Sequence, residues 1–338
     1  MIDVDRMESQ LQSAARTGVR APKPARAVGP RSAPTVAPTL AAASARVLAR
    51  LRGPAAVAEP AEATPPRRAR SRLLQLLDDG DMPGADRHMA DEPSRREQLS
   101  WATMRALLDG RQDVARSKNS AMQALALESG DREAMHRYWL QRLWLVVTWG
   151  TDEERDELAE HCRDRAYRAD DLQWTAALAV VLAQMGKRGE AGEVFEDAFG
   201  RLGPAEEGIQ LDVATNLVEA AAFLRDAFLG ARLHYTLAWT PDRLVTIGDG
   251  WTCKGAVERY RALGAAAAGL FTEADADFSR AVARHRALGA RPLLAQTLHQ
   301  WGTTLAGRDD DKAADCLREA GALARQIQLA GPALRGGA

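Results

Sequence analysis

The chain has 338 residues, enough for two compact domains or one long helical array. It is 46% hydrophobic but only 5% aromatic, and Ala supplies much of the apolar content, which favours close-packed helices over β-sheets. The three Cys residues have no paired spacing, the first residues lack a signal-peptide pattern, and no apolar run approaches about 18 residues. These features argue against a disulfide-stapled or membrane-spanning protein, and we expect a cytoplasmic protein without membrane insertion.

The first 70 residues are rich in Pro, Ala and Arg, with nine Pro residues between positions 22 and 66. Pro at this density prevents helices, so we expect residues 1–70 to form a disordered basic arm. The net charge of the chain is −1, yet residues 1–73 hold 13 basic and 5 acidic side chains. Three interpretations follow: the arm binds nucleic acid, it binds an anionic membrane surface, or it is a solvated linker.

From about Ser71 onward, a helix-breaking residue is repeatedly followed five positions later by Ala. The clear copies are Gly80–Ala85, Gly110–Ala115, Gly186–Ala191 and Gly269–Ala274, and weaker ones are Asp226–Ala231, Arg308–Ala313 and Gly150–Arg155. Successive copies lie 30 to 43 residues apart, a period that indicates stacked helix–turn–helix units. In such a unit Gly ends the first helix in a left-handed cap, and Ala lets the second helix approach closely.

A bulky and then a small residue follow the Ala, as in Ala191, Phe195 and Ala198. These spacings keep the three side chains on one helix face. We therefore predict an all-α solenoid of about six to seven helix pairs over residues 71–330, followed by a frayed tail over 331–338. In chain order, the expected helices are a short pair near 71–90 and single helices near 95–109, 112–128, 131–148, 152–167, 170–185, 189–201, 205–224, 228–239, 254–268, 272–287, 292–306 and 311–328.

One connection, residues 240–253, is longer than the usual link between helices, and long loops are commonly functional or mobile. Two alternatives remain for it. Either it contacts whatever enters the solenoid, or its apolar residues Val245, Ile247 and Trp251 fill a gap between neighbouring helix pairs. The charges of Asp249 and Lys254 have no evident structural task, so we assign these two residues to recognition.

The small–bulky–small ladder resembles the one in the second helix of each tetratricopeptide repeat, and residues 172–199 fit that repeat pattern best. The long connection and the segments 256–264 (AVERYRALG) and 281–297 (AVARHRALGARPLLAQT) resemble the C-terminal tetratricopeptide-like region of STAND-type ATPases. These ATPases occur in LuxR/MalT-like transcription regulators and in some nucleotide cyclases, and the resemblance covers roughly residues 95–329. It implies an arm for effector sensing and interaction. The chain lacks a GxxxxGK[ST] phosphate loop and a visible helix-turn-helix. The resemblance therefore implies the sensor or scaffold part of such a regulator, without its ATPase domain or its DNA-binding domain.

The candidate reactive groups form no known constellation. The six His residues contain no HxxxH pair, and Cys253 beside Lys254 has no base nearby in sequence. The acidic clusters Asp152–Glu154 and Asp309–Asp311 stand where helices begin, which indicates capping and not cation binding. We therefore expect no catalytic residue, no metal and no cofactor.

The first helix of each pair lines the concave surface of a helical-repeat solenoid, and ligands usually bind there. The inward positions are predicted to be Arg137, Trp144, Gln173, Val180, Asn216, Phe223, Arg259 and Leu263. Apolar surface with a few Arg and amide groups suits a peptide or helix laid in a groove. The sequence thus predicts a non-catalytic scaffold or sensor that binds a protein, a peptide or a small effector in a bacterial regulatory assembly. The alternative is a nucleic-acid-associated transcription regulator that uses the basic arm.

Overall fold

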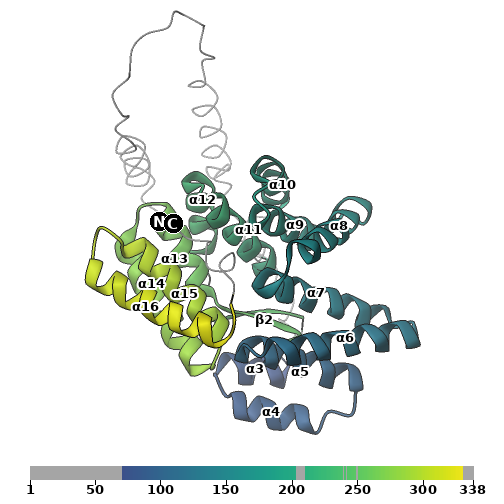
Figure 1. Cartoon of the computed structure of the whole chain (residues 1–338). Helices are drawn as coiled ribbons and strands as arrows, with labels where there is room; N and C mark the ends of the chain where they lie inside the picture. Colours follow the sequence, from purple (N-terminus) through teal and green to yellow (C-terminus); the bar gives the residue numbers. More distant parts are fainter. Residues whose placement is uncertain (1–70, 203–209, 239, 241, 249, 330–338) are drawn as a thin grey trace, which may run out of the picture. The chain divides into compact units, whose positions relative to one another are not determined.

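The computed structural model describes residues 71–202, 210–238, 240, 242–248 and 250–329 (Figure 1). The chain divides after residue 70 into two units, and the fold described below is that of the second unit. The predicted arm over residues 1–70, the predicted tail over 331–338 and the predicted recognition residue Asp249 lie outside the described residues.

The all-α prediction is confirmed: the described residues form fourteen helices and one short β-hairpin. The helices are α3 (Arg72–Asp78), α4 (Met82–Ala90), α5 (Arg95–Asp109), α6 (Gln112–Ser129), α7 (Arg132–Trp149), α8 (Asp152–Arg168), α9 (Leu172–Gln184), α10 (Arg188–Arg201), α11 (Leu211–Leu224), α12 (Ala227–Leu237), α13 (Val257–Ala267), α14 (Phe271–Ala287), α15 (Arg291–Leu305) and α16 (Asp310–Gln326). The hairpin comprises β1 (Leu244–Ile247) and β2 (Thr252–Ala256), in the segment predicted to be a loop. The helix predicted from residue 205 begins at Leu211.

Several helix ends lie where the sequence signals placed them, although Gly150, the breaker of the weakest copy, is extended with φ of −66° and forms no left-handed cap. The predicted left-handed caps at Gly80, Gly110, Gly186 and Gly269 all have φ between 73° and 78°. Thr151 and Glu154 form a reciprocal capping box at the start of α8, and the Asp309 side chain accepts from the Lys312 amide at the start of α16. Capping therefore accounts for both acidic clusters.

The helix pairs meet at their small residues. The second-helix residues Ala85, Ala115, Ala191 and Ala274 are completely buried. Within the pairs, α5 packs on α6, α9 on α10, α13 on α14 and α15 on α16. The first helices α5, α7, α9, α11, α13 and α15 also contact one another in that order, so they form a continuous inner layer.

The last pair, α15 and α16, also makes contacts with α5 and with the end of α7, which lie far earlier in the chain. In an open solenoid each repeat contacts only its neighbours. Here α15 packs on α5, and the Trp149 indole at the end of α7 donates a hydrogen bond to the Ile327 carbonyl at 3.2 Å. A Cβ on Gly110 would lie 2.8 Å from the Ile327 side chain, which shows how closely the two ends approach. The hairpin lies inside this arrangement and contacts α5, α11, α13 and α14 (Figure 1).

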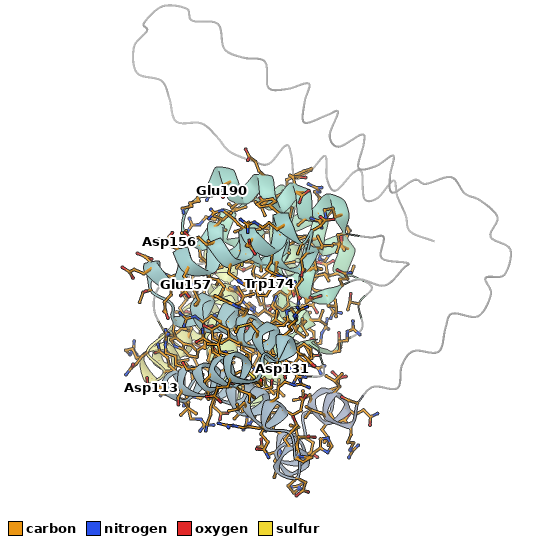
Figure 2. The ribbon with its side chains drawn as sticks, turned by 90° about the vertical axis from the view of Figure 1, so that its right-hand side faces the viewer. Asp113, Asp131, Asp156, Glu157, Trp174 and Glu190 are labelled. Carbon is orange, nitrogen blue, oxygen red and sulfur yellow. The ribbon has the colours of Figure 1, made fainter. Side chains whose placement is uncertain are left out.

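Asp156 and Glu157 of α8 and Glu190 of α10 are exposed and lie to the left of and above the buried Trp174 in Figure 2. Basic residues of neighbouring helices pair with them: Lys187 with Asp156 (3.6 Å), Arg142 with Glu157 (3.2 Å) and Arg163 with Glu190 (2.7 Å). Exposed pairs of this kind contribute about 0–1 kcal/mol each. They join neighbouring helices and form no concentrated acidic site.

The register of the second helices is tested by comparing Ala274→Leu with Ala266→Leu. Ala274 is completely buried in α14, whereas Ala266 near the end of α13 is half-buried. We expect Ala274→Leu to lower the free energy of unfolding by about 1–3 kcal/mol more than Ala266→Leu, because the added methylenes overpack a closed contact. Urea unfolding of both full-length variants measures the difference. Equal losses would contradict the assigned register.

Candidate functional site

The β1–β2 hairpin organises the inner face of the first helices. Its strands pair antiparallel, with Thr246 opposite Cys253 and Ile247 opposite Thr252. Val245 is completely buried and Ile247 is only 8% exposed. The hairpin therefore fills the space between helix pairs, as one of the two alternatives for this segment predicted.

Arg137 holds the turn end of the hairpin from α7. Its guanidinium donates to Glu97 and to Glu133, both at 2.5 Å, and lies 4.1 Å above the Trp251 ring. One turn along α7, the Gln141 side chain donates to the Trp251 carbonyl at 2.7 Å. The predicted binding residue Arg137 is thus buried and engaged by partners within the fold.

Lys254 projects from β2 into the inner layer and is 3% exposed. Its ammonium donates to Thr215 Oγ1 at 2.9 Å and to Asn216 Oδ1 at 2.6 Å, and it lies 5.6 Å from the centre of the Trp144 ring. Burial lowers the pKa of Lys254 to about 8, and the charge of Glu219 opposes that shift. The expectation that this charge has no structural task was wrong, because Lys254 joins the hairpin to α11.

Arg259 lies in the first turn of α13 and is 2% exposed. It donates to Glu219 Oε1 and to Gln300 Oε1, each at 2.9 Å. The Tyr260 hydroxyl accepts from Arg259 and donates to the Lys254 carbonyl, so one chain of contacts joins the two cations. The ion pair and its amide partner offset the cost of burying the guanidinium.

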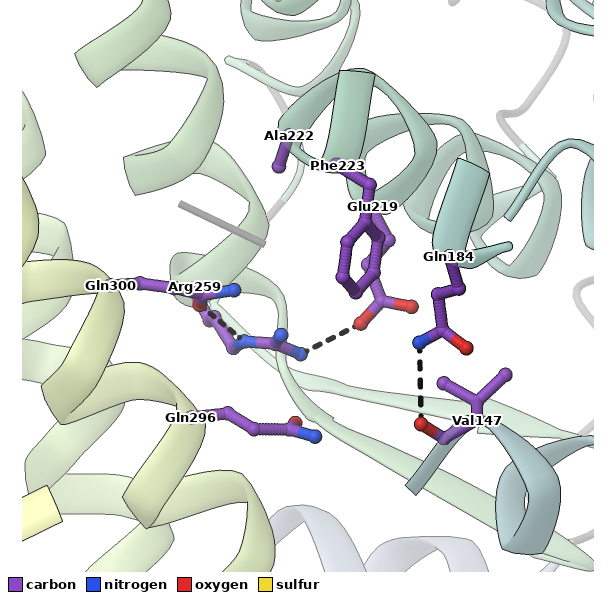
Figure 3. Close-up of a pocket in the computed structure, with 8 residues that line it drawn as sticks. All are labelled: Val147, Gln184, Glu219, Ala222, Phe223, Arg259, Gln296 and Gln300. Atoms are coloured by element: carbon purple, nitrogen blue, oxygen red, sulfur yellow. Dashed lines mark hydrogen bonds and ion pairs between the residues drawn. The ribbon is translucent and has the colours of Figure 1, made fainter. Parts of the chain in front are cut away.

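A small hollow lies beside this ion pair, where five first helices converge (Figure 3). It has an empty volume of about 260 Å³, including space open to solvent, and is lined by Val147, Gln184, Glu219, Ala222, Phe223, Arg259, Gln296 and Gln300. Within the described residues, Gln184 Oε1 and Gln296 Oε1 are buried without a hydrogen-bond donor. Two free acceptors in so narrow a space suit a small donor such as water.

The structure brings together only part of the predicted set. Trp144, Asn216, Lys254 and Arg259 belong to one buried network, and Phe223 lines the adjoining hollow. Gln173 instead donates to Asp212 at 2.7 Å, and Val180 and Leu263 are buried in the apolar core. Sequence reasoning missed Glu219, although a lone carboxylate inside the apolar run of α11 is a signal of a buried ion pair.

A second, more open site lies at the junction of the α3–α4 turn, the start of α13 and the second half of α14. This outer groove has a volume of about 720 Å³, including space open to solvent. Its lining residues are Leu77, Asp78, Asp79, Gly80, Asp242, Glu258, Arg280, Ala283, Arg284, Ala287 and Leu288. Sequence reasoning missed this groove because its walls come from four separate segments of the chain: residues 77–80, Asp242, Glu258 and residues 280–288.

The one nucleophile candidate from the sequence is held in an unreactive form. Cys253 is 4% exposed, and burial raises the pKa of its thiol to about 11. The thiolate is the nucleophilic form of cysteine, so Cys253 stays protonated at neutral pH.

No family model, curated protein or solved structure matches the chain. The resemblance to STAND-type regulators therefore stays a prediction from the sequence. Among the described helices, none combines the length and apolarity needed to cross a bilayer. The same residues contain no group of three or more His, Cys, Asp or Glu side chains arranged to hold a metal ion.

Replacing Trp251 by Ala separates a structural from a recognition role for the hairpin. Its ring contacts Arg137 and packs edge-on against His136, at 6.2 Å between ring centres. We expect Trp251→Ala to lower the melting temperature by several degrees, because a large aromatic contact is lost. Tyr167→Ala, which removes a 64% exposed ring, serves as the control and should melt like the parent. An unchanged melting temperature for Trp251→Ala would contradict the structural role.

His285 gives the hairpin a predictable pH dependence. Its Nε2 accepts from the Ala256 amide at 2.9 Å and its Nδ1 lies 3.0 Å from Thr297 Oγ1, so the ring serves as a neutral acceptor. Burial, aided by the charges of Arg259 and Arg284, lowers the pKa of His285 to about 3. The unfolded chain binds this proton near pH 6.5, so the stability due to neutral His285 is complete above that pH and is lost as pH falls toward 3.

We therefore expect the free energy of unfolding to fall more steeply between pH 7 and pH 5 in the parent than in His285→Gln. Urea unfolding at both pH values measures the two slopes. His88→Gln, at an exposed position, is the matched control and should keep the parent slope. Equal slopes for parent and His285→Gln would show that His285 does not titrate on unfolding.

Proposed function

We propose that the protein is a non-catalytic, tetratricopeptide-like scaffold or sensor that binds a polypeptide partner in a cytoplasmic bacterial regulatory assembly. The observation that carries this proposal is the outer groove. Its cavity volume of about 360 Å³ falls within the range of about 300–1,000 Å³ that is common for ligand sites. Its walls combine apolar and charged side chains, which suits an extended segment with both kinds of residue.

The inner face is a poorer place for such a partner. The hairpin occupies it, and Arg137, Asn216, Lys254 and Arg259 direct their polar groups to partners within the fold. A peptide laid there would have to displace these contacts, and a buried charge left unpaired costs about 3–5 kcal/mol. The hollow beside Arg259 has a cavity volume of about 10 Å³, which is room for a water molecule at most.

The nucleic-acid alternative depends on residues 1–73, with 13 basic and 5 acidic side chains. Binding through these residues must weaken steeply as salt rises, because phosphate contacts release counterions. A gel-shift titration of the full chain over a range of salt concentrations tests it, and no shift at low salt would remove it.

The groove proposal is tested by panning a displayed library of random peptides against the full-length protein. We expect enriched peptides that bind the parent but not Ala283→Trp, because a bulky ring at this exposed groove position fills the space. Ala276→Trp, exposed on the same helix outside the groove, is the matched control and should bind like the parent. Failure to enrich any peptide, or equal binding by Ala283→Trp, would contradict the proposed function.

A further inference from the structure

The charges of the outer groove are unbalanced. Four carboxylates line it, from Asp78, Asp79, Asp242 and Glu258, against the guanidiniums of Arg280 and Arg284. Outside the groove lining, Asp277 pairs at 2.5 Å with Arg280, and Arg261 pairs at 2.5 Å with Asp242. With these two partners included, five carboxylates still face three guanidiniums. The groove therefore has an acidic excess that favours a cationic ligand and opposes an anionic one.

Glu258 is the most unusual of these carboxylates. It stands in the first turn of α13, lines the groove, and is 1% exposed. Its Oε1 accepts from Arg284 at 3.0 Å, but its Oε2 is buried and has no hydrogen-bond donor within the described residues. A buried acceptor without a donor is unfavourable, so a ligand that supplies a donor there gains affinity.

The neighbouring walls fit the stem of a long basic side chain. Leu77 and Leu288 are buried beside the exposed Ala283 and Ala287, which gives the groove a low apolar floor. Arg and Lys lay their methylene stems on such surfaces while the charged head reaches a polar partner. A carboxylate accepts from two guanidiniums at once, so Arg284 and an incoming cation can share Glu258.

We propose that the outer groove recognises an Arg or Lys side chain of a polypeptide partner, whose N–H group donates to Glu258 Oε2. This inference rests on the proposed function and names the chemistry of its partner. The exposed Asp79 at the end of α3 contributes long-range attraction at the rim.

Fluorescence anisotropy on the full-length protein tests this, with a labelled peptide of Ala, Gly and Ser that carries two central Arg residues. A second peptide replaces both Arg residues by citrulline, which keeps the shape and removes the charge. We expect the Arg peptide to bind at least about tenfold more tightly than the citrulline peptide. Glu258→Gln should remove that advantage, and Glu157→Gln, an equal charge change on the exposed surface of α8, should retain it.

Asp79→Asn guards against misfolding of Glu258→Gln, because Asp79 is exposed. We expect Asp79→Asn to weaken the binding of the Arg peptide about twofold to fivefold and to leave the affinity for the citrulline peptide unchanged, as is usual for a charge at the rim of a site. Equal binding of the two peptides, or equal affinities of Glu258→Gln and Glu157→Gln for the Arg peptide, would overturn the inference. Enrichment of neutral peptides that Ala283→Trp fails to bind would overturn it while leaving the proposed function intact.

Discussion

Burial of the β1–β2 hairpin against the first helices is the constraint on which the rest of this unit depends. The hairpin buries Lys254, and α13, which directly follows the hairpin, buries Arg259. Burying such a charge costs several kcal/mol unless the charge has a partner. Thr215, Asn216 and Glu219 supply that pairing from α11. At Gly255, with φ of +87°, a Cβ would lie 2.4 Å from His285 Nε2, so the strand can approach α14 only because no side chain is present there.

The same constraint moves the candidate binding surface outward. A solenoid usually offers its concave face to ligands. In this unit, the hairpin and the contacts of α15 with α5 occupy the inner layer. The charged groups there pair within the fold, and two acceptors left without a donor among the described residues, Gln184 Oε1 and Gln296 Oε1, line a hollow with little free space. The outer groove is wider, its carboxylates outnumber its guanidiniums, and Glu258 Oε2 is also without a donor there in the part of the chain that the structure describes. An unsatisfied acceptor at an open groove is better explained by a partner than by the stability of the fold.

The features that sequence reasoning predicted correctly are those set by local chemistry. Helix limits follow from caps such as Thr151 and Gly110, and the buried face of the second helices follows from small residues such as Ala191. The hairpin was missed because its strands have four and five residues, although Gly248 and Gly250 around a turn are a recognised hairpin signal. The contact of α15 with α5 depends on curvature summed over several pairs, which no local pattern encodes. The partners of Lys254 and Glu258 are likewise distant in the chain. A reading of local patterns therefore assigned Lys254 to recognition and gave no indication of Glu258.

Hydrogen exchange on the complex with the Arg-containing peptide tests most directly whether binding occurs at the outer groove and not on the inner face. The account predicts that the peptide slows exchange in the α3–α4 turn, around residues 78–82, and at the start of α13, around 257–261, and leaves α7 and α9 unchanged. Slower exchange in α7 and α9, with no change in those two segments, would place the partner on the inner face and contradict the account.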